Sequence, residues 1–371
     1  FYDSIFFNVP HLRFPEFTEE WETKPINDLA VVIGGGTPDT TVKSYWDGEI
    51  QWFTPSEIGK TKYVDSSLRT ITEDGLNNSS AKRLPPNTIL LSSRATIGEC
   101  SLSLRECATN QGFQSLVSKK CNVDFLYYLI QTKKKDLIRK SCGSTFLEIS
   151  ANEVRKIQVS IPSDVEQQKI AGLLSLIDER IATQNKIIDK LQSLIKGITQ
   201  NITLHNKPNV RISECLECTS STLQESDALR SGTYPVYGAN GIVGYLDNYS
   251  TQDEAVYIIK DGSGVGTVSY VTGQCSTTGT LNTLQAKEGY SLQYLYYILK
   301  VFNFEPYKTG MAIPHIYFKD YGKAKIFCPS YTKQLQYARL LSAIDGKVST
   351  EQNSLASLSL QKQYLLRQMF I

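Results

Sequence analysis

The side chains that could do chemistry in this 371-residue chain are polar, aromatic and basic groups on predicted loops. Arg pairs with guanine edges, Asn and Gln pair with adenine edges, and Lys, Ser and Thr bind phosphates, so the chemistry on offer is nucleic-acid contact. The first-half candidates are Thr37, Gln51, Trp52, Thr54, Ser92, Ser93, Arg94, Thr96, Asn110 and Gln111, with a basic cluster at Lys133, Lys134, Lys135, Arg139 and Lys140. The second-half candidates are Tyr237, Asn240, Lys260, Ser263, Asn282, Lys308, Thr309 and His315. Each alone is better explained as a solvated or turn-forming residue, so the signal is collective.

Catalytic constellations are absent from the sequence. There is no GxxxxGK[ST] phosphate loop, no GxSxG elbow and no HExxH helix. The Asn/Asp-Pro-Pro-aromatic motif of amino-methyltransferases is also missing, because "LPPN" at 84–87 has the wrong flanks. The glycine-rich segments 32–38 and 260–266 lack the GxGxxG order and are interpreted as tight turns or as loops that approach a ligand's backbone. The sequence therefore predicts no catalytic residues in this chain.

Cysteine and histidine usage predicts no metal site, and no cofactor is expected in this chain. The CxxC pair Cys215 and Cys218 has no second pair, and none of His11, His205 and His315 stands at metal spacing from it. The eight scattered cysteines fit reduced thiols in a cytosolic protein. No apolar run approaches the ~18 residues of a membrane span, and the first residues do not read as a signal peptide, so a cytoplasmic location is expected. The net charge of +2 neither diagnoses nor excludes nucleic-acid binding, because a local basic face is enough.

Two long segments, 162–202 and 329–369, carry the same pattern at one constant offset, which takes Pro162 to Pro329 and Asp178 to Asp345. Apolar residues alternate at spacings of four and three through more than four heptads of each copy, which predicts coiled-coil helices. The seam residues expected to pair the helices are Ile170, Leu174, Ile177, Ile181, Ile188 and Leu191 in the first copy and Leu341, Ile344, Val348, Leu355 and Leu358 in the second. Gln184 and Glu351 form a polar layer at the same position of both seams. Lys362 is a further polar seam position, and its replacement by Leu should strengthen pairing unless Lys362 already binds a carboxylate.

The remaining pattern predicts a duplicated domain of mixed α and β structure. Strands are expected at 87–93, 112–118, 254–260 and 265–271, and helices at 123–140 and 292–302. The predicted boundaries are 1–163 and 205–330 for the two globular domains and 164–204 and 331–371 for the helices. A helix of ~60 Å cannot bury its apolar stripe on one such domain, so the other copy is the expected partner. The alternative is that each helix packs only on its own domain.

The order of these motifs resembles one known family, the specificity subunits of type I restriction-modification enzymes. The segments "LRFPEFTEEWETKPINDL" and "GGGTPDTTVKSYWDGEIQWFTPSEIG" are similar to one class of target-recognition domain in that family, and "SGTYPVYGANGIVGYLDNY" followed by "YIIKDGSGVGTVSYV" is similar to another. The long helices resemble the family's central and distal conserved regions, which begin here with Pro162, Gln167 and Ile170. The distal copy keeps Pro329 and Gln334 but replaces the isoleucine with tyrosine.

The resemblance implies an α/β fold in which two target-recognition domains with twisted sheets are separated by two long helices, paired as an antiparallel coiled coil with an internal pseudo-twofold repeat. It implies a non-catalytic subunit whose domains each read one half of a bipartite site in double-stranded DNA, with the helices setting the spacer. Gly143, Ser144 and Thr145 would lie near the DNA backbone. The implied partners are two methyltransferase subunits, which bind S-adenosylmethionine and methylate adenine, and restriction subunits that use ATP and Mg; no membrane is involved. Half-sites one helical turn of ~34 Å apart would suit helices of this length.

Two other interpretations stay open. A nucleotide-dependent transferase could use the glycine-rich loops, and methyl transfer by the purified chain alone would favour it. A coiled-coil scaffold could join other proteins without reading DNA, and sequence-independent binding in salt titrations would favour that.

Overall fold

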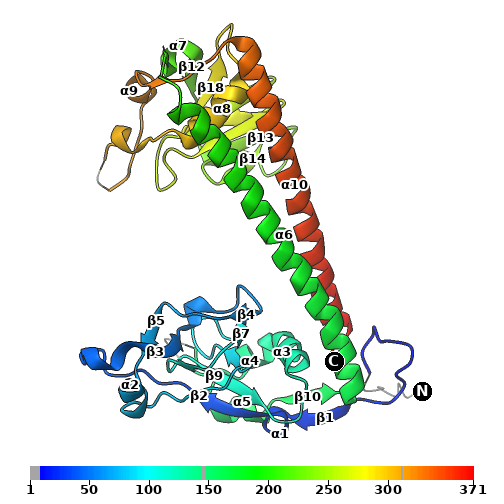
Figure 1. Ribbon diagram of the computed structural model, residues 1–371. Coiled ribbons are helices and arrows are strands. Elements are labelled where there is room, and N and C mark those ends of the chain that lie inside the picture. Colours follow the sequence, from blue (N-terminus) through cyan, green and yellow to red (C-terminus); the bar gives the residue numbers. More distant parts are fainter. Residues whose placement is uncertain (1–8, 144–146, 311) are drawn as a thin grey trace. The chain divides into compact units, whose positions relative to one another are not determined.

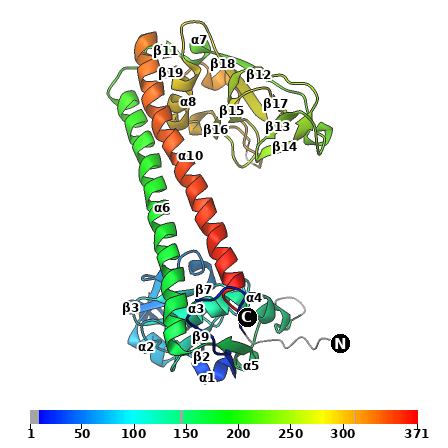
Figure 2. The same ribbon diagram turned by 90° about the vertical axis from the view of Figure 1, so that its right-hand side faces the viewer.

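The computed structural model describes residues 9–143, 147–310 and 312–371 (Figures 1 and 2). The chain divides into two compact units, one formed by the residues up to Asn185 together with Ser354–Ile371 and the other by Lys186–Asn353; they are called unit 1 and unit 2. Each unit contains one sheet-rich region and a part of both long helices. Within the described ranges, no helix is long and apolar enough to cross a membrane.

Unit 1 is built on a five-stranded sheet with the strand order β2-β9-β6-β7-β4, a three-stranded sheet β5-β3-β8 and the pair β1-β10. The strands are β1 (Glu22–Pro25), β2 (Ala30–Gly34), β3 (Trp46–Phe53), β4 (Tyr63–Val64), β5 (Arg69–Ile71), β6 (Ile89–Leu91), β7 (Cys100–Ser103), β8 (Cys107–Thr109), β9 (Gln114–Ser118) and β10 (Gln158–Ile161). The helices are α1 (Ile26–Leu29), α2 (Glu73–Asn77), α3 (Val123–Thr132), α4 (Lys134–Arg139) and α5 (Ala151–Lys156), with 3-10 turns η1 (Lys43–Tyr45) and η2 (Pro55–Glu57). Helix α3 is almost wholly buried and joins the main core of the unit.

Unit 2 has the same kinds of part: a four-stranded sheet β12-β18-β15-β16, a three-stranded sheet β14-β13-β17 and the pair β11-β19. Its strands are β11 (Val210–Arg211), β12 (Leu216–Ser220), β13 (Tyr234–Gly238), β14 (Gly241–Leu246), β15 (Glu254–Ile259), β16 (Val268–Thr272), β17 (Ser276–Thr277), β18 (Leu281–Ala286) and β19 (Lys325–Ile326). Its short helices are α7 (Ile212–Cys215), α8 (Leu292–Val301) and α9 (Phe318–Tyr321), with 3-10 turns η3 (Glu225–Asp227) and η4 (Glu305–Tyr307). The predicted mixed α/β class is confirmed, and α8 in unit 2 corresponds to α3 in unit 1.

The two long helices are α6 (Asp164–Leu204) and α10 (Tyr331–Gln368). Every predicted pairing residue is buried or half-buried, whereas most of the other positions on these helices are exposed. In unit 1 the beginning of α6, at Ile170 and Leu174, shares a core with Leu365 at the end of α10 and with Met369, the residue after that helix. The end of α6 belongs to unit 2 with the beginning of α10. The helices therefore run antiparallel within each unit, as the two views of Figures 1 and 2 also show.

A buried glutamine fixes the first turn of each long helix to its unit. In unit 1, Gln167 Nε2 donates to the carbonyl of Pro162 at 3.0 Å, and its Oε1 accepts from the backbone N–H of Asn122, the N-cap of α3, at 3.0 Å. In unit 2, Gln334 bonds in the same way to Pro329 at 2.9 Å and to the N-cap of α8 at 2.9 Å. The proline-to-glutamine spacing in both copies thus aligns a long helix with a short one.

Candidate nucleic-acid interface

Three predicted loops of unit 1 converge at the ends of its strands. The backbone N–H of Asn110 donates to the carbonyl of Phe53 at 3.1 Å, which joins the loop after β8 to the end of β3. Thr37 Oγ1 donates to Gln111 Oε1 at 2.5 Å, which adds the loop after β2. Gln111 is exposed, and Thr37 and Thr54 are half-buried. These side chains therefore border one surface, although they lie far apart in the sequence.

The loop that follows β6 joins the same surface. The backbone N–H of Ser93 donates to the carbonyl of Gly112 at 2.8 Å, and the backbone N–H of Ile149 donates to the carbonyl of Ser93 at 3.1 Å. Arg94 forms an ion pair with Glu148 at 2.8 Å, and the two side chains are 43 % and 38 % exposed. Because a guanidinium carries five N–H donors, this one pair leaves Arg94 able to bind a further acceptor. Thr96, on the same loop, is exposed.

Several predicted contact residues turn out to support the loops instead. Trp52 is 5 % exposed, and its Nε1 donates to the carbonyl of Gly36 at 2.9 Å. Ser92 and Ser93 are fully buried. Gln51 is half-buried, and its Oε1 accepts from the backbone N–H of residue 67 at 2.7 Å. The structure therefore does not support the prediction that the side chains of Trp52, Ser92 and Ser93 contact DNA directly, because β-strand ends place them in the interior.

Cys142 and Glu148, on either side of residues 144–146, are paired beside the 92–94 segment. Cys142 and Glu148 exchange two backbone hydrogen bonds of 2.9 Å each. Gly143 follows with a φ of 134°, a conformation that favours glycine, and it is exposed. The predicted contacts Ser144 and Thr145 lie outside the described residues.

Unit 2 repeats this arrangement at the offset that separates the two long helices. Thr309 and His315 exchange backbone hydrogen bonds of 2.9 and 2.8 Å, as Cys142 and Glu148 do in unit 1. The backbone N–H of Ile316 then donates to the carbonyl of Lys260 at 2.9 Å, which corresponds to the bond between Ile149 and Ser93. The backbone framework is the same in both units, whereas the side chains that it presents differ.

The side chains on this framework in unit 2 surround a cavity. Lys260 and Asn282 line a hollow of about 330 Å³ together with Ser220, Tyr317 and Lys319. The Asn282 side chain is 3 % exposed, donates to the Tyr321 hydroxyl at 3.0 Å and accepts from Ser220 Oγ at 3.1 Å. Asn282 is therefore a wall of the hollow rather than a protruding contact.

Sequence reasoning missed Tyr317 and Lys319. The Tyr317 ring is 48 % exposed, and Lys319 Nζ lies 5.3 Å from its centroid. An exposed aromatic ring beside a cation suits stacking on a base next to a phosphate. The signal available in the sequence was a Tyr-Phe-Lys run shortly after His315, in a segment otherwise rich in turn residues.

The other second-half candidates border the same region but differ in their exposure and in their side-chain partners. His315 Nδ1 lies 3.1 Å from Asp261 Oδ1, and Lys308 Nζ lies 2.5 Å from the Glu305 carboxylate, so both side chains already have acidic partners. Thr309 and Ser263 are exposed, and Ser263 follows Gly262, whose φ is 96°. Asn240 is exposed at the turn between β13 and β14, and half-buried Tyr237 packs 5.8 Å from the Tyr257 ring.

The basic cluster of the first half is largely neutralised within unit 1. Lys133 donates to the carbonyl of Ile371, Lys134 pairs with Glu99, Arg139 with Asp136, and Lys140 with Glu153. Burial also lowers the pKa of Lys133. Four of the five basic residues therefore have partners within unit 1, which explains why a run of like charges is tolerated there.

Glycines in the two glycine-rich segments allow a close approach between loops and a tight turn. A Cβ on Gly35 would come within 1.9 Å of the Asn110 carbonyl oxygen, so glycine lets the loop after β2 approach the loop after β8. Gly262 and Gly266 adopt φ values of 96° and 91° in the turn between β15 and β16. In the described part of the chain, no three His, Cys, Asp or Glu residues are grouped as a metal site.

A family model, the type I restriction modification DNA specificity domain, matches residues 18–193 and again residues 207–360. The chain belongs to this family. It contains two copies of the specificity domain, and the comparison supports the prediction of a DNA-recognition subunit rather than an enzyme. The alternatives of a transferase and of a scaffold that does not read DNA are not favoured.

Curated relatives carry the same description. The type I restriction enzyme EcoprrI specificity subunit of Escherichia coli is 25% identical over 384 residues, which cover 94% of this chain and 92% of that protein. The MjaIX specificity subunit of Methanocaldococcus jannaschii is 39% identical over 181 residues, but the match spans only 47% of this chain and 42% of the relative.

Solved structures share the fold. The S subunit of a type I restriction-modification system from M. genitalium has a TM-score of 0.65 at 18% identity, with 98% of this chain and 99% of that chain covered. A chain from a study of complex assembly and conformational transition of the type I R-M system has a TM-score of 0.55 at 15% identity, with 96% and 98% covered. The paired sheet regions and long helices are thus a family architecture.

Proposed function

We propose that each unit reads one half of a bipartite, asymmetric sequence in double-stranded DNA. The reading surface of unit 1 would be formed by the loops 37, 53–54, 92–96, 110–111 and 142–148, and that of unit 2 by 260–263, 280–282 and 308–319. On these loops the exposed side chains of Gln111, Tyr317 and Lys319 and the half-buried side chains of Arg94, Asn110 and Lys260 can contact base edges and phosphates.

The observation that carries this proposal is the repeated framework with unlike side chains. In both units the same backbone bonds pair two residues beside the strand-end segment, Cys142 with Glu148 and Thr309 with His315, and join the next residue to that segment. Unit 1 presents the Arg94–Glu148 pair at this place, whereas unit 2 presents Asp261 and His315. A duplicated scaffold that offers different hydrogen-bonding groups is suited to reading two different half-sites.

The long helices would fix the distance between the half-sites and dock two methyltransferase subunits. S-adenosylmethionine would be bound by those partners, and restriction subunits that use ATP and Mg could join the complex. Because α6 and α10 rise by ~1.5 Å per residue, their length would set the unread spacer directly.

The test is specific DNA binding by this chain assembled with its methyltransferase subunits. Arg94→Ala and Lys260→Ala should each weaken specific binding by about tenfold, since one charged base contact contributes ~1–3 kcal/mol of discrimination. Lys120→Ala, an exposed lysine just after the end of β9 and away from the 110–111 loop, is the matched control. Unchanged affinity and unchanged sequence preference for both variants would remove these residues from the reading surfaces.

A further inference from the structure

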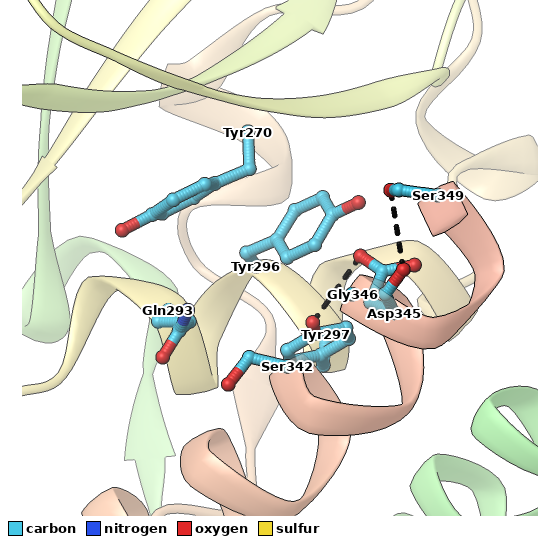
Figure 3. A pocket seen from close by; sticks show the side chains of 8 residues that line it. All are labelled: Tyr270, Gln293, Tyr296, Tyr297, Ser342, Asp345, Gly346 and Ser349. Atoms are coloured by element: carbon cyan, nitrogen blue, oxygen red, sulfur yellow. Dashed lines mark hydrogen bonds between the residues drawn. The ribbon is translucent and has the colours of Figure 1, made fainter. Parts of the chain in front are cut away.

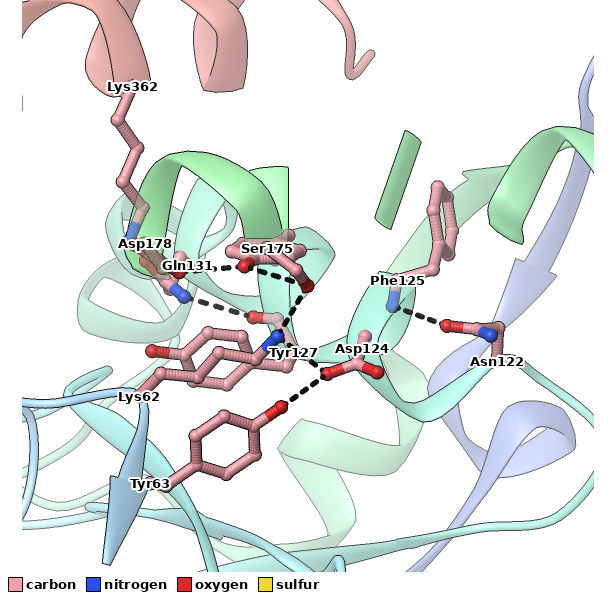
Figure 4. A network of polar contacts seen from close by, with 11 residues as sticks. Lys62, Tyr63, Asn122, Asp124, Phe125, Tyr127, Gln131, Ser175, Asp178 and Lys362 are labelled. Carbon is pink, nitrogen blue, oxygen red and sulfur yellow. Dashed lines mark hydrogen bonds and ion pairs between the residues drawn. The ribbon is translucent and has the colours of Figure 1, made fainter. Parts of the chain in front are cut away.

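A buried lysine fills the contact between the short and long helices of unit 1. The Lys62 side chain is 6 % exposed, and its Nζ lies 2.6 Å from Asp124 Oδ1 and 2.7 Å from Ser175 Oγ. The same ammonium lies 4.9 Å from the Tyr128 ring centroid and 5.8 Å from that of Tyr127 (Figure 4). Carboxylate, hydroxyl and aromatic faces together form a site for one primary ammonium group.

A second lysine completes the charge balance beside it. Lys362 on α10 pairs with Asp178 on α6 at 2.7 Å, and the Tyr128 hydroxyl donates to the other Asp178 oxygen at 2.7 Å. Burial and the nearby Asp178 carboxylate raise the pKa of Tyr128, so its hydroxyl remains a donor. At this contact in unit 1, two carboxylates are thus matched by two ammonium groups.

The repeat places the same side chains in unit 2. The offset between the long helices takes Ser175 to Ser342 and Asp178 to Asp345, and the alignment of α3 with α8 takes Tyr127 and Tyr128 to Tyr296 and Tyr297. The Tyr297 hydroxyl donates to Asp345 Oδ2 at 3.3 Å, which reproduces the bond between Tyr128 and Asp178. The wall of the site is therefore present in both copies within this chain.

One lysine and one carboxylate, however, are missing from the second copy. At the helix offset, Ile195 on α6 corresponds to Lys362, and in the alignment of α3 with α8, Gln293 stands where the first copy has Asp124. Within the part of the chain that the structure describes, Asp345 forms no ion pair. One carboxylate of unit 2 consequently faces the site without an ammonium group.

Where Lys62 lies in unit 1, unit 2 has an open pocket, lined by the counterparts of Asp124 and Ser175. Its walls are Tyr270, Gln293, Tyr296, Tyr297, Ser342, Asp345, Gly346 and Ser349, and its volume is about 240 Å³ (Figure 3). At ~30 Å³ for each water molecule, this space admits the terminal carbons and ammonium of a lysine. Lys300 Nζ lies 5.2 Å from the Tyr296 ring, but the Lys300 side chain is exposed and is not part of the wall.

We propose that this Asp345 pocket receives one lysine side chain from a methyltransferase subunit, in the place that Lys62 occupies in unit 1. The inference rests on the proposed function, which puts that subunit on the long helices, and Asp345 lies on α10. The chemistry of the pocket selects a primary ammonium group on an alkyl chain: one carboxylate, hydroxyl and amide acceptors, and the edges and faces of tyrosine rings.

The first experiment uses the purified chain and n-butylammonium as the probe. Titration followed by NMR should show saturable binding that Asp345→Asn weakens at least tenfold, while n-butanol, which has no charge, should not bind. Asp189→Asn, which changes an exposed carboxylate on α6, is the matched control and should bind like the unchanged chain. Absence of saturable binding would overturn the proposal that the pocket binds an ammonium group.

The second experiment identifies the occupant in the assembled complex. Carbodiimide coupling followed by mass spectrometry should join Asp345 to a lysine of the methyltransferase subunit, and Asp345→Asn should weaken assembly at least tenfold. Coupling to Lys300 instead, or full-strength assembly of the Asp345→Asn chain, would overturn the proposal. If only the pocket proposal fails, the complex would still bind DNA specifically. If the proposed function fails, the complex would show no sequence preference, even when Asp345 couples to a lysine of the methyltransferase subunit.

Discussion

The seam residue Lys362 gives the sharpest test of how the helices are held together. The sequence left two outcomes for Lys362→Leu: stronger pairing if the lysine is an unpaired polar defect, and weaker pairing if it binds a carboxylate. The pair with Asp178 at 2.7 Å selects the second outcome. Substitution would leave the Asp178 carboxylate, only 14 % exposed, without its cation.

The magnitude follows from the burial of the pair. Removing one partner costs ~0–1 kcal/mol for an exposed ion pair and ~3–5 kcal/mol for a buried one. With both side chains less than one-fifth exposed, this pair lies nearer the buried limit. The Tyr128 hydroxyl still donates a hydrogen bond to Asp178, and burial of the apolar leucine returns ~1 kcal/mol of stability. We therefore expect a net loss of about 2 kcal/mol, or a Tm decrease of ~4–8 °C for a cooperative unit of this size.

Urea unfolding of the purified chain, followed by circular dichroism, measures this difference. Lys190→Leu, at an exposed position of α6, should change the free energy of unfolding by less than ~0.5 kcal/mol. The double variant Asp178→Asn with Lys362→Leu should recover about half of the loss, because no uncompensated charge remains. A more stable Lys362→Leu single variant would refute the reasoning.

Three further predictions concern the helix starts, the thiols and the helix length. Gln167→Leu should destabilise unit 1 by about 2 kcal/mol because it leaves the buried Pro162 carbonyl and the half-buried Asn122 N–H without their partner, whereas Gln168→Leu, at the exposed neighbouring position, should be nearly neutral in the same urea assay. Burial raises the pKa of Cys100, Cys107 and Cys121 to about 12, so these thiols stay neutral at pH 8 and iodoacetamide should label exposed Cys142 first; rapid native labelling of Cys100 would argue against this packing. Because these thiols ionise only in the unfolded chain, they also make stability fall as pH rises above ~8.5. Inserting one heptad into each long helix, after Asn185 and after Asn353, keeps the seam in phase. It adds ~10 Å of helix, so at ~3.4 Å per base pair the unread spacer of the methylated motif should widen by about three base pairs. An unchanged spacer would show that helix length does not set the spacing.

The helices and the repeat could be predicted because their signals are periodic and local. The seam residues Ile170 and Leu341 belong to a heptad pattern that only a buried helical stripe sustains, and both are buried. Asparagine and serine caps likewise begin α3 and α8 where the sequence placed helices. Repetition at a fixed offset then predicted a duplicated fold from one chain alone.

The reading surfaces could be predicted only in part, because side-chain direction at a strand end depends on pairing register. Trp52 and Arg94 have equally suitable chemistry for DNA, yet β3 turns Trp52 inward and the loop after β6 leaves Arg94 half-exposed. The basic cluster at 133–140 also looked free, because its partners Glu99 and Glu153 come from other elements. Long-range pairing of this kind leaves no mark in the local sequence.

The most direct test of the central claim is a map of methylated adenines in cells that express this chain with its methyltransferase subunits. The account predicts one bipartite motif with a fixed unread spacer, and replacement of the unit 2 loops 260–263 and 308–319 should change one half of the motif while the other half stays the same. A continuous motif, or a change in both halves after that replacement, would contradict it.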